Sequence, residues 1–167
     1  ERVYVDMVEL SKNPHVQVQH FVCEFSKFSY AHVIHKDSVE ELYGGLVALA
    51  SRYGYWPDAL CHDGNAVYEH TVFEKILDLH GVEVKEGATH TPRHQATVER
   101  AHTTLKTCYQ RTREDLLEMQ FGELDPQMVV NMVCIAMNNS PLSKSNLSPN
   151  RICYGREMSL MDRSLLD

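Results

Sequence analysis

Three acidic residues stand where an unpaired carboxylate is costly. Asp6 interrupts the apolar run of residues 3–8, Asp63 directly follows the apolar segment 59–62, and Glu99 lies one turn into a segment with a helical apolar stripe. A carboxylate near a core needs a partner or a cation. Three of them together would form an oxygen-only site, which suits Mg²⁺ or Mn²⁺ better than zinc. Two such ions about 4 Å apart would hold the attacking and leaving oxygens of an in-line phosphoryl transfer.

Each acid also has an ordinary structural explanation. Asp6 fits a bend in an edge strand, Asp63 fits a turn before Gly64, and Glu99 fits the first turn of a helix, where acids are common. Taken singly, the three residues leave both explanations open. Their joint placement at strand ends and beside a helix favours the metal site, because open α/β sheets place their sites at the carboxyl ends of strands.

The surrounding sequence predicts a mixed α/β fold that would bring these acids together. We expect an antiparallel three-stranded meander first, and then strands that alternate with helices. The predicted strands are 3–8, 16–25, 29–35, 59–62 and 82–84, and the predicted helices are 38–53, 71–80, 96–119, 126–137 and one from 149, with a loop at 87–95. Ser38 and Glu41 form a capping-box pattern, whereas Gly44 and Gly45 weaken that helix by about 1 kcal/mol each and would permit a close approach.

A family resemblance covers residues 4–157. Asp6, Asp63 and Glu99, with 35 residues between the last two, resemble the Asp, Asp-35-Glu signature of retroviral and LTR-retrotransposon integrases. Residues 91–100, with the sequence TPRHQATVER, resemble the Pro-x-x-x-Gly-x-Val-Glu-Arg segment of that family. Residues 37–57 resemble the helix of the family and the Tyr-Gly-x-Pro turn that follows it. Asn-Asn-Ser-Pro at 138–141 and the residues from Ser148-Pro149 to Tyr-Gly-Arg at 154–156 resemble the retrotransposon tail.

The resemblance implies an RNase H-like α/β fold, with a five-stranded mixed sheet flanked by helices, in a single catalytic core of residues 1–167 excised from a longer polypeptide. It implies a nucleotidyltransferase and endonuclease that uses two Mg²⁺ or Mn²⁺ ions. Asp6 and Asp63 would share one ion, and Glu99 with Asp6 would hold the other. Water would cleave near the 3′ end of the element's DNA, and the freed 3′ hydroxyl would then attack target DNA.

The resemblance also implies the partners. Gln95 and Lys106 match residues that contact DNA in the family, and Arg93 and Arg100 would add phosphate contacts. A solvated loop amide and plain solvated basic side chains remain the alternatives at these positions. We expect element ends and target DNA as partners, and a homodimer or higher homo-oligomer formed through helical faces of the core. The expected location is the nucleus, with a cytoplasmic nucleoprotein particle if the element is active.

The chain departs from the family pattern at four places. Gly64-Asn65 replaces Asn-Gly after the second acid, Ala96 replaces a loop glycine, His102 replaces an asparagine, and Thr103 stands where retroviral members have a lysine. Ala96 should stiffen the loop or change its path. These departures keep open a domesticated host protein that acts as a non-catalytic nucleic-acid or protein-binding scaffold. A host nuclease of RNase H type is a third hypothesis, which the 35-residue spacing disfavours.

Charge and composition set further limits. The chain of 167 residues has a formal net charge of −7, which taken alone argues against a nucleic-acid partner. Residues 1–86 carry the whole deficit, however, and residues 87–113 carry five basic residues and one acid. Two divalent ions would reduce the net charge to −3.

The five scattered cysteines indicate small buried side chains in a reducing compartment, and no apolar run predicts a membrane span.

Overall fold

The computed structural model describes residues 1–36, 38–62, 64, 68, 70–86, 92–122 and 124–155, and at residues 86, 92–95 and 97 it describes the backbone alone. An initial run of three strands is followed by two helices that alternate with two strands, and then by three consecutive helices. The strands are β1 (Arg2–Lys12), β2 (His15–Cys23), β3 (Ser29–Ile34), β4 (Ala59–His62) and β5 (Glu83–Glu86). The helices are α1 (Val39–Tyr53), α2 (Thr71–Leu79), α3 (Pro92–Glu118), α4 (Pro126–Asn139) and α5 (Pro149–Tyr154).

The strands form one five-stranded mixed sheet in the order β3-β2-β1-β4-β5. The first three strands are an antiparallel meander, and β4 and β5 join it in parallel to β1 and to each other. Two parallel strands need a crossover connection, which α1 supplies between the meander and β4 and α2 supplies between β4 and β5. The expected α/β fold, with a five-stranded mixed sheet flanked by helices, is confirmed.

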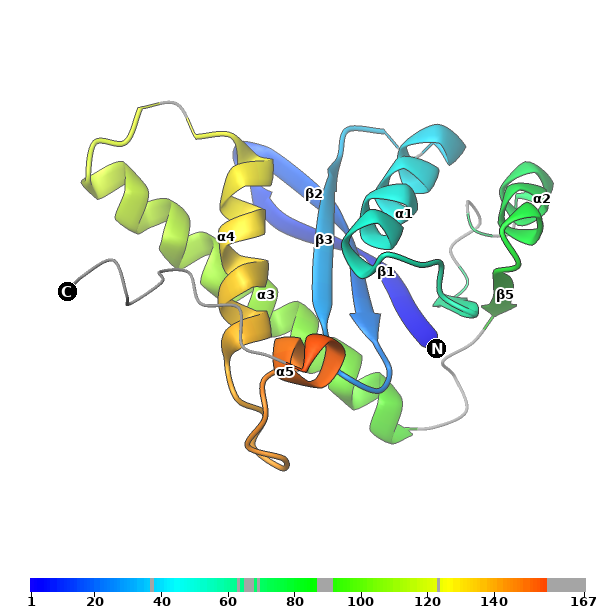
Figure 1. Cartoon of the computed structure of the whole chain (residues 1–167). Helices are drawn as coiled ribbons and strands as arrows, with labels where there is room; N and C mark the ends of the chain where they lie inside the picture. Colours follow the sequence, from blue (N-terminus) through cyan, green and yellow to red (C-terminus); the bar gives the residue numbers. More distant parts are fainter. Residues whose placement is uncertain are drawn as a thin grey trace.

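Each face of the sheet has its own hydrophobic core. Val3, Val5 and Phe21 point to the face that α1 and α2 cover, where Leu46 and Phe73 pack against them. The opposite face is covered by α3 and α4 and contains, among others, Val8, Leu10, Val18, Leu105, Tyr109 and Val130. Figure 1 shows the long helix α3 running diagonally across the sheet on the side away from α1. None of the described helices is long and apolar enough to cross a membrane.

Side-chain amides of α4 cover the outer edge of β3. Asn138 accepts a hydrogen bond from the Ser29 N–H (2.7 Å) and donates one to the Ser29 carbonyl (2.8 Å). Gln127, three helical turns earlier, accepts from the Val33 N–H (2.7 Å) and donates to the Ala31 carbonyl (3.1 Å). An open edge strand can pair with other chains. The two amides therefore occupy backbone groups that a further strand would otherwise use.

Replacing Asn138 by Ala is expected to lower the free energy of unfolding by about 2 to 4 kcal/mol, because it leaves two backbone groups of Ser29 without partners in a buried setting. Urea unfolding followed by circular dichroism measures the change. Asn131→Ala on the same helix is the control, since the Asn131 amide contacts the side chains of Arg52 and Gln127. A loss as large for Asn131→Ala as for Asn138→Ala would contradict the special role of Asn138.

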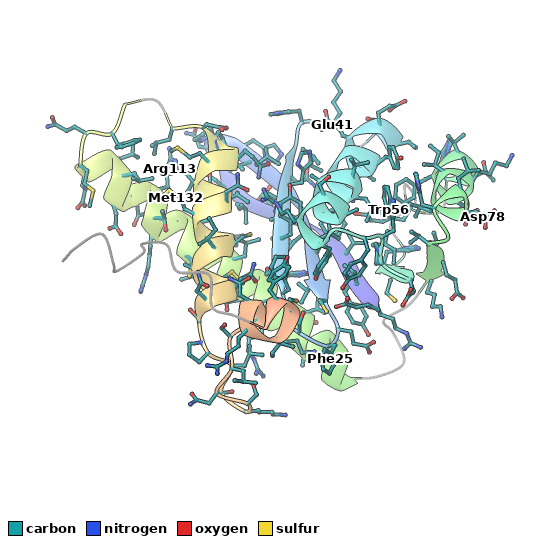
Figure 2. The ribbon with its side chains drawn as sticks, in the orientation of Figure 1. Phe25, Glu41, Trp56, Asp78, Arg113 and Met132 are labelled. Carbon is teal, nitrogen blue, oxygen red and sulfur yellow. The ribbon has the colours of Figure 1, made fainter. Side chains whose placement is uncertain are left out.

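Local signals placed most helix starts correctly. The Ser38 hydroxyl accepts the Glu41 N–H (3.3 Å), and Asp125 and Ser148 accept N–H groups in the same way at the starts of α4 and α5. The Glu41 carboxylate accepts hydrogen bonds from the His35 and Lys36 N–H groups, and these lower its pKa (Figure 2). The Glu41 side chain thus links α1 to the end of β3, because these two N–H groups belong to residues between β3 and Ser38, the N-cap of α1.

Several predicted boundaries were wrong, and the two largest differences are at the end of β1 and the start of α3. The first strand continues past residue 8 to Lys12, because Ser11 and Lys12 still pair with Val16 and His15 of β2. The expected loop at 87–95 is shorter, since α3 begins at Pro92 and its backbone is helical through Ala96. Proline is accepted in the first turn of a helix, and alanine has the highest helix propensity, so both residues favour this early start.

Candidate active site

Asp6 lies in the middle of β1 on the face that α3 covers. Successive strand residues point to opposite faces, so Asp6 shares its face with Val8, which packs against α3. The Asp6 side chain is 30% exposed, so solvent and ions can reach it. Its Oδ1 atom accepts the Met7 N–H (2.7 Å), and its Oδ2 atom lies 3.4 Å from Nδ1 of His102. The carboxylate is therefore held from two sides by neighbouring groups.

Asp63 lies outside the described residues, so its position in the site stays a prediction. The strand register nevertheless relates it to Asp6. Tyr4 of β1 pairs with Cys61 of β4 in parallel. Asp6 stands two residues beyond Tyr4, and Asp63 stands two residues beyond Cys61. Each acid therefore comes two residues after one member of this pair, and β1 and β4 run in the same direction.

Glu99 lies on α3 with its side chain exposed. His102, which faces Asp6, follows Glu99 by three residues, a rise of about 4.5 Å along the helix. Residues three apart lie on neighbouring parts of a helix surface. Because His102 contacts Asp6, the helical turn that contains Glu99 lies next to the part of β1 that contains Asp6.

Two histidines and a serine behind Asp6 were not predicted to belong to the site. His20, the cross-strand partner of Asp6 on β2, is fully buried, and its ring lies 5.0 Å from that of His102. Its Nε2 atom is 2.5 Å from the Ser29 hydroxyl. Burial lowers the pKa of His20 well below 6.5, and the nearby His102 lowers it further. His20 is therefore neutral at pH 7. In the sequence, only its position in line with the core-facing valines of β2 indicates that this histidine is buried.

The predicted DNA-contacting residues fall into two groups. Arg100 and Lys106 are exposed on α3, where they are free to meet a phosphate backbone. The side chains of Arg93 and Gln95 lie outside the described part of the structure, although their backbone forms the first turn of α3. Thr103 donates its hydroxyl hydrogen to the Glu99 carbonyl (3.0 Å) within the helix. All four DNA contacts stay predictions.

His62, Trp56 and the apolar face of α4 have packing roles in the fold. His62 is buried at the end of β4, where its ring packs against Tyr68 at 5.3 Å. Trp56 lies between α1 and α2, stacked on His80 with ring centroids 4.0 Å apart (Figure 2). The apolar face of α4 is part of the core, with Val129 and Val133 buried. The five cysteines are unpaired. Cys23, Cys61 and Cys134 are buried as expected, whereas Cys108 and Cys153 are partly exposed.

The donor atoms at hand suit a hard divalent cation. Asp6 and Glu99 offer carboxylate oxygens, and both side chains are open to solvent. Such oxygens are the ligands that Mg²⁺ and Mn²⁺ prefer. Within the described residues, which do not include Asp63, no three His, Cys, Asp or Glu side chains are grouped closely enough to hold a metal ion. The two described carboxylates have the chemistry of the expected metal site, and their joint role in it stays a prediction.

No family model matches the sequence, and no curated protein matches it significantly. Solved structures do. The catalytic core domain of BIV integrase is similar with a TM-score of 0.77 and 18% identity, over 92% of this chain and 93% of that one. The HTLV-2 integrase catalytic core domain, in complex with magnesium in a trimeric form, has a TM-score of 0.76 and 15% identity, over 92% and 96% of the two chains.

A third structure is the simian T-cell lymphotropic virus intasome in complex with PP2A regulatory subunit B56 gamma, with a TM-score of 0.80 and 16% identity. The match covers 95% of this chain and 56% of that one. At such low identities the similarity establishes the fold, and it agrees with the observed strand order and helix layers. This chain has the RNase H-like fold of retroviral integrase catalytic core domains.

Proposed function

We propose that the chain is the catalytic core of an LTR-retroelement integrase, a divalent-metal-dependent polynucleotidyl transferase that processes 3′ ends of DNA and joins them to target DNA. The observation that carries this proposal is the contact between His102 and Asp6. It fixes α3 on β1 within one turn of Glu99, in a chain whose fold is that of integrase cores. This contact supports the placement of Glu99, one helical turn from His102, near Asp6.

The pairing of β1 with β4 relates the third acid, Asp63, to Asp6. Asp63 follows β4 directly, and the pairing of Tyr4 with Cys61 supports its placement beside Asp6. Asp6 and Asp63 would then hold one Mg²⁺ or Mn²⁺ ion, and Asp6 with Glu99 would hold a second. Divalent ions held in this way supply electrostatic stabilisation of the charge that develops on phosphoryl oxygens. The magnesium complex of the HTLV-2 core supports this choice of metal.

The DNA would lie along the exposed face of α3. Arg100, Lys106 and Arg111 are exposed on this helix, and residues 87–113 carry a net charge of +4. Basic side chains on one helix position a nucleic-acid backbone without reading its sequence. The rest of the core is acidic, so we expect the isolated chain to bind DNA weakly. Metal ions at the carboxylates and further domains of the longer polypeptide would supply additional affinity.

We also propose that the core forms homo-oligomers. Met132 and Ile135 are 43% and 40% exposed, respectively, and they are one turn apart on α4. Met132 lies on the side of α4 that points away from the sheet (Figure 2). Exposed apolar side chains on a helix that also packs the core favour contact with a second copy. The trimeric form of the HTLV-2 core supports this part of the proposal.

The test is metal-dependent DNA joining. We expect the protein to cleave and rejoin a branched strand-transfer DNA with Mn²⁺ and to lose this activity when EDTA removes the metal. Asp63→Asn should lack the activity while it unfolds at the same temperature as the wild type. Equal activity in the Asn variant would remove Asp63 from the site. No DNA chemistry by the wild type within its full-length polypeptide would favour the non-catalytic scaffold.

A further inference from the structure

A line of polar contacts runs from Asp6 into the interior of the protein. Oδ2 of Asp6 faces Nδ1 of His102 at 3.4 Å, and the ring of His102 packs against that of His20 with 53° between the planes. Nε2 of His20 is 2.5 Å from Oγ of Ser29, and Asn138 holds the backbone N–H and carbonyl of Ser29. The line therefore joins β1, α3, β2, β3 and α4 on one face of the sheet.

Exposure falls steadily along this line. The side chains of Asp6 and His102 are 30% and 15% exposed, and His20 is completely buried. His20 lies directly opposite Asp6 in the antiparallel pair, so the two side chains leave the same face of the sheet a few ångströms apart. His102 packs against both of them. Its ring is therefore limited on one side by a carboxylate and on the other by an imidazole that cannot turn away into solvent.

A histidine at position 20 lowers the stability of the fold relative to an apolar residue of similar volume. Nδ1 of His20 is buried and has no hydrogen-bond partner among the described residues. An unsatisfied buried polar atom costs about 1 to 3 kcal/mol, which an apolar side chain of similar volume would avoid. The valines Val16 and Val18 fill the preceding core positions of the same strand. Stability alone therefore does not account for a histidine here, and its contacts with Ser29 and His102 are what an apolar residue would lose.

We propose that His20 is a positioning residue for the metal site. Held by Ser29, it fixes the ring of His102 so that Nδ1 faces Oδ2 of Asp6, while the Met7 N–H holds Oδ1. His20 thereby sets the orientation of the Asp6 carboxylate toward a divalent cation. The inference rests on the proposed function, in which Asp6 is a metal ligand. Groups that orient metal ligands typically change metal affinity 10- to 100-fold when they are removed.

The test is Mn²⁺ binding to the chain without DNA, measured by calorimetry. His20→Leu keeps the volume but loses the bond to Ser29, and we expect its Mn²⁺ affinity to fall about 10-fold or more. His20→Gln places an amide near the former Nε2 position and should retain the affinity to within about 3-fold, because the bond to Ser29 can form again. Equal affinities of the wild type and His20→Leu would overturn the proposal.

Two further variants separate positioning from loss of stability. Val130→Ala removes core packing on α4 and should destabilise the fold without weakening Mn²⁺ binding. The double variant His20→Leu/His102→Ala should bind Mn²⁺ as His102→Ala does, because His20 acts through His102. Independent effects of the two substitutions would overturn this route, and so would a matching loss of affinity in Val130→Ala.

Asp6→Asn shows which proposal has failed. If it abolishes Mn²⁺ binding while His20→Leu binds normally, the positioning role alone is wrong. If the wild type binds no Mn²⁺, or if Asp6→Asn binds it as well as the wild type does, Asp6 is not a metal ligand. That result would overturn the proposed metal-dependent function together with the inference that depends on it.

Discussion

Replacing Glu99 by Gln is expected to lower the rate of DNA strand transfer by about 10³-fold or more. The amide has the shape of the carboxylate but no charge, and in the proposed site three carboxylates would already offer only three negative charges to two divalent ions. Losses of this size are typical when a group that acts on the transition state is removed. The measurement is the initial rate of strand-transfer product with Mn²⁺ at saturating DNA.

Glu114→Gln is the matched control for this experiment. Glu114 is also an exposed carboxylate on α3, but it lies toward the other end of the helix, near Leu116. Both substitutions change one surface charge, so each should alter the free energy of unfolding by less than about 0.5 kcal/mol. The control should keep the wild-type rate. Wild-type activity in Glu99→Gln would remove Glu99 from the active site, whatever the fold resembles.

The sequence carried strong local information about the frame of this site. Helix starts were predictable where an oxygen-bearing side chain precedes the helix, as at Ser38, Asp125 and Ser148, because capping depends on residues only two or three positions away. The alternation of apolar and polar residues placed the meander, and the buried segment before Asp63 placed β4. These features depend on nearest neighbours along the chain, and the structure confirms them.

The start of α3 shows where a family pattern misleads. The resemblance assigns a flexible loop before Glu99, and a glycine in the family pattern supports that loop. Here Ala96 replaces the glycine, and the helical backbone reaches back to Pro92. The difference follows from helix propensity, since glycine costs about 1 kcal/mol relative to alanine in a helix. Helix propensity at this position therefore moves the helix boundary, which the family pattern does not predict.

The contacts behind Asp6 could not be predicted, because they join residues that are distant in sequence. His20 and His102 meet only when α3 crosses the sheet, and neither spacing nor periodicity relates them. Asn138 was assigned to a family tail pattern, whereas in the structure its amide binds the edge of β3. The identity of a polar residue shows that it needs a partner, but only the tertiary fold determines which one it meets.

Adding one methyl group to Gly45 is expected to destabilise the protein by about 1 to 3 kcal/mol, although alanine is the better helix former. A Cβ at this position of α1 would overlap Oε1 of Gln19 and lie 3.2 Å from its Cδ and 3.3 Å from Cβ of His32. Gln19 is fully buried beneath the helix, so its amide has no exposed position to move to. The overlap should therefore outweigh the gain in helix propensity.

The adjacent glycine provides the control. A Cβ on Gly44 would meet no atom within 4 Å, so Gly44→Ala should stabilise the protein by about 0.5 to 1 kcal/mol through helix propensity alone. Urea unfolding of the two variants should thus give changes of opposite sign. Combining Gly45→Ala with Gln19→Ala should recover most of the stability lost, because the overlapping amide is gone. Equal stabilisation by both alanines would instead mean that Gln19 moves freely, and that α1 does not need a glycine to lie this close to β2.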